Sequence, residues 1–152
     1  MHVVITGANR GIGKALADRY RAAGHEVTGT ARDGSEAVTL DVTNPDQQIA
    51  MGGALAGRPV DLLICNAGVY LDKGEPIEGY PAEMWAQSFA ANVTGVFLSV
   101  QALLPNLRAS KGRIAIISSQ MASHTRAPGG SYIYRSSKAA ALNLGRNLAT
   151  DL

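Results

Sequence analysis

A glycine-rich turn near the start of the chain constrains the fold more than any other feature of the sequence. An apolar run at residues 3–5 is followed by Thr-Gly-Ala-Asn-Arg-Gly-Ile-Gly at residues 6–13, and a helical pattern then covers residues 14–23. Glycines permit a tight turn and let backbone N–H groups approach a pyrophosphate, to which the helix N-terminus adds positive potential. A glycine-rich turn alone is often only a turn, but the strand before it and the helix after it predict dinucleotide binding.

Strand and helix patterns alternate along the rest of the chain, without a Pro/Ser-rich linker, an internal repeat or a low-complexity block. This order predicts an α/β fold with a doubly wound, Rossmann-like parallel sheet and helices on both faces. We expect strands near residues 2–6, 25–30, 37–41, 60–65 and 112–118, and helices near residues 11–23, 46–56, 82–107 and 131–151. Residues 31–36 are too few for the usual crossover helix between parallel strands, so we expect a helix-free link there.

The composition fits a single domain of this class. The chain has 152 residues, 46% hydrophobic and 17% charged, and no apolar stretch reaches the roughly 18 residues of a membrane span. With 14 basic and 12 acidic residues the formal net charge is +2, and no Lys/Arg run supports binding to nucleic acid or to a membrane. The single cysteine, Cys65, is expected to be a core residue, and without a visible signal peptide we expect a cytoplasmic location. The histidines lack metal-ligand spacing, so we predict no metal site.

Tyr134 and Lys138 stand four residues apart in the last predicted helix. This spacing places phenol and ammonium on one face of the helix. A nearby positive charge stabilises a phenolate, as general acid–base catalysis requires. The same spacing also occurs on solvated helix faces, so the pair gains its weight only from the glycine turn at the other end of the chain.

Five motifs along the chain resemble those of the short-chain dehydrogenase/reductase family and follow one another in the family's order. The turn at residues 6–13 is similar to the family's Thr-Gly-x-x-x-Gly-x-Gly fingerprint, and Tyr134 with Lys138 resembles its catalytic pair. Between them lie Asn66-Ala67-Gly68, Asn92-Val93-Thr94-Gly95 and Ile116-Ile117-Ser118-Ser119. The resemblance extends over the whole chain. It implies hydride transfer between a nicotinamide cofactor and a carbonyl or alcohol substrate, by a homo-oligomer (dimer or tetramer).

The resemblance implies that four residues take part in catalysis. Tyr134 would be the general acid in reduction and the base in oxidation, while Lys138 would support the phenolate and bind the nicotinamide ribose. Ser119 would donate a hydrogen bond to the substrate carbonyl oxygen. Ser118 is the alternative, and both serines could instead bond to the backbone at the strand end. Asn92 would kink its helix and position a water molecule that links Lys138 to solvent.

The resemblance also implies which residues bind the cofactor. They are Gly7, Asn9, Arg10, Gly11, Ile12, Gly13, Arg32, Asp41, Val42, Asn66, Ala67, Gly68, Tyr134 and Lys138. Asp41 and Val42 would contact the adenine, and residues 66–68 would lie beneath the arm that joins adenosine to nicotinamide. Simple turns are the alternative interpretation of both segments.

The end of the second predicted strand bears on the choice between NADP(H) and NAD(H). An acidic residue there usually binds the ribose 2'-hydroxyl of NAD, whereas a 2'-phosphate favours arginine. Arg32 follows the strand and Arg10 lies in the glycine turn, so two guanidinium groups could hold one phosphate. We therefore expect NADP(H), whereas Asp33 would favour NAD(H) if its carboxylate faces the ribose.

The sequence stops at Leu152, inside the helix that carries Tyr134, whereas the family's fold continues with further strands. We therefore expect one dinucleotide-binding domain over residues 1–152, without the C-terminal strands, as a truncated or cleaved product. Two functions remain open. The first is an NADP(H)-dependent carbonyl reductase or alcohol dehydrogenase, and the second is a non-catalytic nucleotide-binding protein or fragment.

Overall fold

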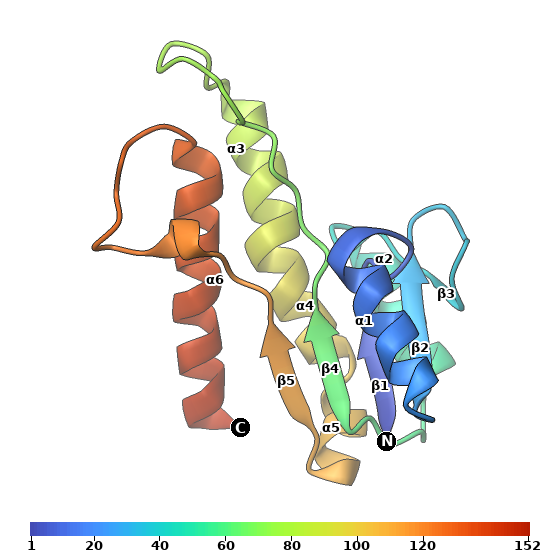
Figure 1. Ribbon diagram of the computed structural model, residues 1–152. Helices are drawn as coiled ribbons and strands as arrows, with labels where there is room; N and C mark the ends of the chain where they lie inside the picture. The colour runs from blue at the N-terminus through green and yellow to red at the C-terminus, as the bar shows by residue number, and fades with distance from the viewer.

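The computed structural model describes all 152 residues, and its elements alternate as the sequence predicts (Figure 1). The strands are β1 (His2–Ile5), β2 (Glu26–Ala31), β3 (Val38–Thr39), β4 (Leu62–Cys65) and β5 (Arg113–Ile116). The helices are α1 (Gly11–Ala22), α2 (Pro45–Ala54), α3 (Ala82–Phe89), α4 (Gly95–Ala102), α5 (Leu104–Ser110) and α6 (Tyr132–Asp151), with a π-helical segment, η1 (Ala90–Thr94), and a 3₁₀ turn, η2 (Gln120–Ala122).

The strands form one parallel sheet in the order β3-β2-β1-β4-β5. Val3 of β1 pairs with Val27 of β2 on one side and with Leu62 of β4 on the other. After β1 the chain therefore adds β2 and β3 on one side of β1, and then crosses to the other side to add β4 and β5. In such sheets ligands bind outside the carboxyl ends of the strands at this reversal. The expected doubly wound α/β fold is confirmed.

The sheet separates two apolar clusters, because alternate residues of a strand point to opposite faces. The larger cluster includes Val4, Leu63 and Cys65 and lies beneath α2, α4 and α6. The smaller one includes Val3, Ile5 and Ile64 and packs against Ala17 of α1. Figure 1 shows α1 standing alone on its face of the sheet. Helices thus cover both faces, but unequally.

The link between β2 and β3 contains no helix, as predicted from its length. β3 is shorter than expected: only Val38 and Thr39 pair, with Thr30 and Ala31 of β2. Leu40 continues the contact, because its N–H donates to the carbonyl of Ala31 at 3.0 Å. The link therefore brings the residues after β3 back beside the end of β2.

The prediction of one continuous helix over residues 82–107 was wrong. The segment contains the π-helical stretch η1 and then ends at Ala102, and α5 starts in a new direction at Leu104, bent by 58°. Pro105 explains the break, since proline has no N–H for the carbonyl four residues earlier and its ring clashes with that carbonyl. No single helix is both long and apolar enough to cross a membrane. The bent pair Ala82–Ala102 and Leu104–Ser110 together has a sufficient length and apolar composition.

Candidate active site

The glycine turn between β1 and α1 has the backbone that its sequence predicts. Gly7 and Gly11 have φ angles of 67° and 53°, a region that glycine adopts without a steric penalty. Gly13 is required for a different reason: a Cβ there would lie 2.0 Å from the carbonyl oxygen of Gly7 and 2.4 Å from Nδ2 of Asn66. Helix α1 therefore starts in direct contact with the turn.

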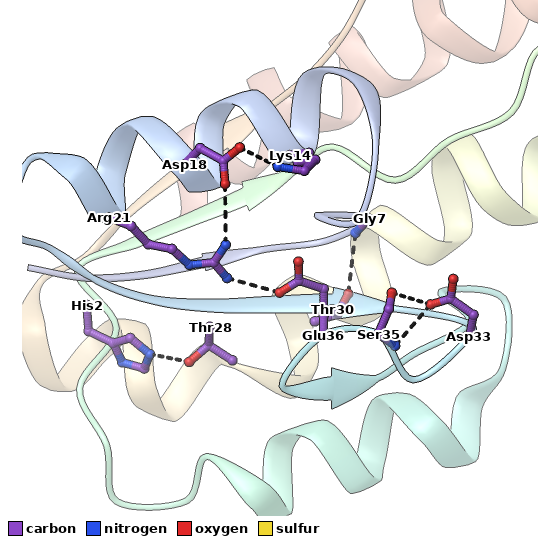
Figure 2. A network of polar contacts seen from close by, with 10 residues as sticks. All are labelled: His2, Gly7, Lys14, Asp18, Arg21, Thr28, Thr30, Asp33, Ser35 and Glu36. Atoms are coloured by element: carbon purple, nitrogen blue, oxygen red, sulfur yellow. Dashed lines mark hydrogen bonds and ion pairs between the residues drawn. The ribbon is translucent and has the colours of Figure 1, made fainter.

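Side chains from two neighbouring strands hold this turn in place. The Thr6 hydroxyl accepts hydrogen bonds from the N–H groups of Asn66 and Ala67, both at 3.0 Å. The Asn66 amide donates to the carbonyls of Thr6 and Gly7, also at 3.0 Å. From β2, the Thr30 hydroxyl accepts from the Gly7 N–H at 3.4 Å (Figure 2). Asn66 thus supports the turn from beneath.

A cleft of about 1530 Å³ opens above the carboxyl ends of the strands. Most residues predicted to bind a cofactor line it: Gly7, Asn9, Arg10, Gly11, Ile12, Arg32, Asp41, Val42, Asn66, Ala67 and Gly68. Gly13, Tyr134 and Lys138 do not. Asp33, which the sequence named as the residue that would favour NAD(H), also lines the cleft, whereas sequence reasoning missed Ala31, Leu40, Thr43, Val69, Tyr70, Leu71, Ala86, Gln87, Ala90 and Ala91. Several of these directly follow strands, which is the signal that could have found them.

Charged groups of both signs face one end of the cleft. The exposed side chains of Arg10 and Arg32 form no ion pair with any carboxylate. Asp33 accepts a hydrogen bond from the Asn9 amide at 3.1 Å. It also accepts hydrogen bonds from the N–H and hydroxyl of Ser35 (Figure 2). The bonds from Ser35 lower the pKa of Asp33. The Asp33 carboxylate is therefore already engaged by neighbours.

Asp41 lies beside Arg32 on the same wall. Burial acts to raise the pKa of Asp41, but hydrogen bonds from the N–H and hydroxyl of Thr43, together with the charge of Arg32, outweigh it and keep the pKa below its usual 3.8. The Asp41 N–H donates to Oε1 of Gln47 at 2.6 Å. Asp41 therefore also serves the turn into α2, as the alternative interpretation expected.

Asn92 lies in the π-helical segment and is 1% exposed. Its Oδ1 accepts from the Val69 N–H at 2.8 Å, and its Nδ2 donates to the Val69 carbonyl and the Ser137 hydroxyl, both at 2.9 Å. The expected backbone contacts of this buried amide are thus present. They connect the segment after β4, the broken helix and α6.

Lys138 and Tyr134 lie together on α6. The Lys138 ammonium is 5.8 Å from the centre of the Tyr134 ring and donates to the carbonyl of Ile117 at 2.9 Å. Lys138 is 6% exposed, and burial lowers its pKa. A Cβ at Gly68, which lines the cleft, would lie 3.5 Å from Nζ of Lys138. The ammonium therefore lies directly behind the cleft wall.

Tyr70 joins Tyr134 to the cleft. The two rings stack with their centres 4.1 Å apart and an angle of 16° between their planes. Tyr70 itself lines the cleft, and its hydroxyl shares a hydrogen bond of 2.6 Å with that of Ser131, just before α6. Tyr134 and Lys138 thus both adjoin the end of the cleft formed by residues 68–71.

The two serines at the end of β5 both bond to backbone groups. The Ser118 hydroxyl donates to the carbonyl of Lys138 at 3.0 Å and so ties the strand end to α6. The Ser119 hydroxyl accepts from the Met121 N–H at 3.1 Å and caps η2. Ser119 keeps its hydroxyl proton for donation, whereas that of Ser118 is already used.

A buried carboxylate that sequence reasoning missed lies at the start of α6. Asp72 is 0% exposed, and its Oδ2 accepts from the Ile133 N–H at 2.9 Å. Its two oxygens are each 3.3 Å from the Tyr134 nitrogen. No local pattern predicts a contact between residues so distant in the sequence.

The chain is similar to known proteins over almost its whole length. The model of the family described as short chain dehydrogenase matches residues 1–152. Serine 3-dehydrogenase of Rhizobium radiobacter is 32% identical over 168 residues, covering 99% of this chain and 65% of that protein. The 3-oxoacyl-(acyl-carrier-protein) reductase MabA of Mycobacterium tuberculosis is 33% identical over 158 residues, covering 99% and 62%. The chain thus spans 62–65% of the length of these relatives.

Solved structures resemble this one closely. A putative short-chain dehydrogenase/reductase from Burkholderia multivorans with bound NADP has a TM-score of 0.89 at 29% identity, over 99% of this chain and 72% of that one. A Brucella ovis oxidoreductase described with a partially ordered NAD has a TM-score of 0.84 at 26% identity, over 99% and 76%. Similar folds thus occur with either nicotinamide cofactor.

Proposed function

Because the chain belongs to the short-chain dehydrogenase family, we propose that it transfers a hydride between NADP(H) and a carbonyl or alcohol substrate. The observation that carries this proposal is the position of Tyr134 and Lys138, whose phenol ring and ammonium are 5.8 Å apart behind the glycine-lined cleft. We further propose that residues 1–152 form one dinucleotide-binding domain of a homo-oligomer.

The residues of the cleft fit a nicotinamide dinucleotide. The cleft has a volume of about 1530 Å³, whereas pockets for compact ligands usually have about 300–1,000 Å³. The larger volume suits an extended ligand. The open turn at Gly7 and Gly11 and the N-terminus of α1 suit a pyrophosphate. Asn66, Ala67 and Gly68 would form the floor, and Asp41 with Val42 the adenine wall. When bound, the cofactor supplies or accepts the hydride at its nicotinamide ring.

Tyr134 would be the general acid in reduction and the general base in oxidation. Its hydroxyl would give a proton to the substrate oxygen or take one from it. Lys138 supports this role because a nearby ammonium stabilises the phenolate. Burial lowers the pKa of Lys138, but its bond to the Ile117 carbonyl uses an N–H and favours retention of the charge. Lys138 would also hold the nicotinamide ribose.

Ser119 and Asn92 would complete the site. Ser119 would donate its hydroxyl proton to the substrate oxygen, a role that its present bond leaves free because in that bond it accepts. Ser118 suits this role less, since its proton is directed to the Lys138 carbonyl. Asn92 would hold the wall of the cleft through Val69 and orient the surroundings of Lys138.

The reaction is tested by replacing the proposed proton donor. We expect Tyr134→Phe to abolish NADPH oxidation, followed at 340 nm with ketones, aldehydes and β-keto esters, while NADPH still binds. Tyr20→Phe on α1 is the matched control and should retain turnover, because Tyr20 is remote from the cleft lining. Turnover that survives Tyr134→Phe would refute the proposed role. NADPH binding without turnover in the unaltered chain would instead favour a non-catalytic nucleotide-binding protein.

The preference for NADP(H) rests on Arg10 and Arg32. Both line the cleft without an ion pair, and guanidinium groups match phosphate oxygens. Asp33 is the opposing feature, although Ser35 and Asn9 already bind its carboxylate. Fluorescence titration should therefore give a lower Kd for NADPH than for NADH. Arg32→Ala should remove the difference and Arg146→Ala, an exposed residue on α6, should leave it; tighter NADH binding would contradict this preference.

A further inference from the structure

Helix α6 begins without a local cap. The first N–H groups of a helix have no partner within the helix, and a side chain just before it usually accepts from them. Ser131 occupies this position, but its φ of 48° places it in the left-handed region and its side chain makes no capping bond. Its hydroxyl is instead bonded to Tyr70.

Asp72 takes the place of the missing cap. Its carboxylate accepts from the N–H groups of Ile133 and Tyr134 and is fully buried. It forms no ion pair, so the positive end of α6 is the charge that compensates it. One of the two amides that it holds belongs to Tyr134 itself.

The segment that carries Asp72 also forms the end of the cleft. Gly68, Val69, Tyr70 and Leu71 line the cleft, and the Asn92 amide binds Val69 on both its N–H and its carbonyl. Tyr70 stacks on the Tyr134 ring. Residues 68–72 therefore form a short strap from the cofactor side of the cleft to the start of α6.

We propose that Asp72 is a positioning residue for Tyr134: its carboxylate fixes the first turn of α6 and so sets the phenol against the cleft. The inference rests on the proposed role of Tyr134. Asn is the sharpest replacement, since it has the shape of Asp but only one acceptor oxygen and would turn N–H donors toward backbone N–H groups. The phenol would then be less firmly held.

The test measures position and catalysis separately. In Asp72→Asn we expect faster hydrogen exchange at the Ile133 and Tyr134 amides and a shift of the Tyr134 ring resonances, which stacking on Tyr70 sets. With a β-keto ester such as ethyl acetoacetate and NADPH, kcat should fall by about tenfold or more while KM and the NADPH Kd change by less than about threefold. Glu83→Gln, in the first turn of α3, is the matched control because its carboxylate binds no backbone amide.

Unchanged exchange and ring resonances in Asp72→Asn would overturn the inference, as would equal losses in kcat and NADPH affinity. If this variant does not fold, Tyr70→Phe decides the question, because it removes the bond to Ser131 and leaves Asp72 intact. The Tyr134 amide should then stay protected, and loss of its protection would assign the positioning to Tyr70. Exchange and ring resonances need no turnover, so an unaltered protein without activity would count against the proposed function alone.

Discussion

At the scale of the residue, Gly13 shows how an absent side chain permits a contact between elements. The space that its Cβ would need is filled by the Gly7 carbonyl and the Asn66 amide. The role of this glycine could be predicted from the sequence, because the spacing of glycines between a strand and a helix already specifies a close approach.

Gly13→Ala should therefore destabilise the protein and weaken NADPH binding. Over-packing of this kind costs about 1–3 kcal/mol in the free energy of unfolding. The neighbouring atoms belong to backbone and to a bound amide and cannot move aside cheaply. Urea unfolding and NADPH titration measure both effects. Gly53→Ala in α2 is the control: nothing lies within 4 Å of its Cβ, so helix propensity should raise stability by about 1 kcal/mol. Equal stabilities of the two variants would contradict this account.

The buried Lys138 predicts a dependence of stability on pH. Burial lowers its pKa in the folded protein below the usual 10.5. At pH values between the lowered pKa of the folded state and 10.5, the unfolded chain binds more protons at Lys138 than the folded chain does. The free energy of unfolding that Lys138 contributes therefore becomes more favourable to the folded state as pH rises through this window. Urea unfolding at pH 8 and pH 10 should show the free energy of unfolding of the unaltered protein rising relative to that of Lys138→Met. A difference that stays constant or moves the other way would refute the prediction.

At the scale of the element, the sequence predicts what is periodic and local. All five strands and the helices α1, α2 and α6 lie where periodicity and the glycine turn place them. The break between α4 and α5 could have been predicted, because its cause is local: Pro105 cannot continue the helix. The contact between Asp72 and α6 has no local cause, because only the packing of the folded chain brings these segments together.

The π-helical segment η1 depends on Asn92, whose amide is matched to the backbone of Val69. In Asn92→Leu the half-buried N–H and carbonyl of Val69 would lose their partner, and each unsatisfied group costs up to about 1–3 kcal/mol. We expect a loss of that order in the free energy of unfolding and weaker NADPH binding, because Val69 lines the cleft. Asn143→Leu, at an exposed position of α6, should change neither. A stable Asn92→Leu variant with unchanged NADPH affinity would show that η1 does not depend on this amide.

At the scale of the whole molecule, the two faces of the sheet differ in their cover. Helices α2, α4 and α6 cover the face of the sheet that carries Ile114 and Ile116, whereas α1 is the helix on the other face. On that face Leu62, Ala115 and Ile117 are partly buried, as Ile114 and Ile116 are on the opposite face. The pattern of apolar residues predicted the strands but not this unequal cover, since apolar residues lie on both faces of β5, Ala115 on one and Ile114 and Ile116 on the other.

The partly buried side chains of Leu62, Ala115 and Ile117 should let this face bind apolar molecules or a second copy of the chain, because apolar surface in contact with solvent favours association. We therefore expect the 152-residue chain to bind the dye ANS in its folded state and to self-associate as protein concentration rises. Ile117→Thr should reduce both, since threonine retains strand propensity but adds a hydroxyl. Ile116→Thr, on the opposite face of the sheet, is the control and should lower the melting temperature without reducing dye binding. ANS fluorescence and sedimentation velocity measure these outcomes. If Ile117→Thr binds as much dye as the unaltered chain, the apolar surface lies elsewhere than on this face of β5.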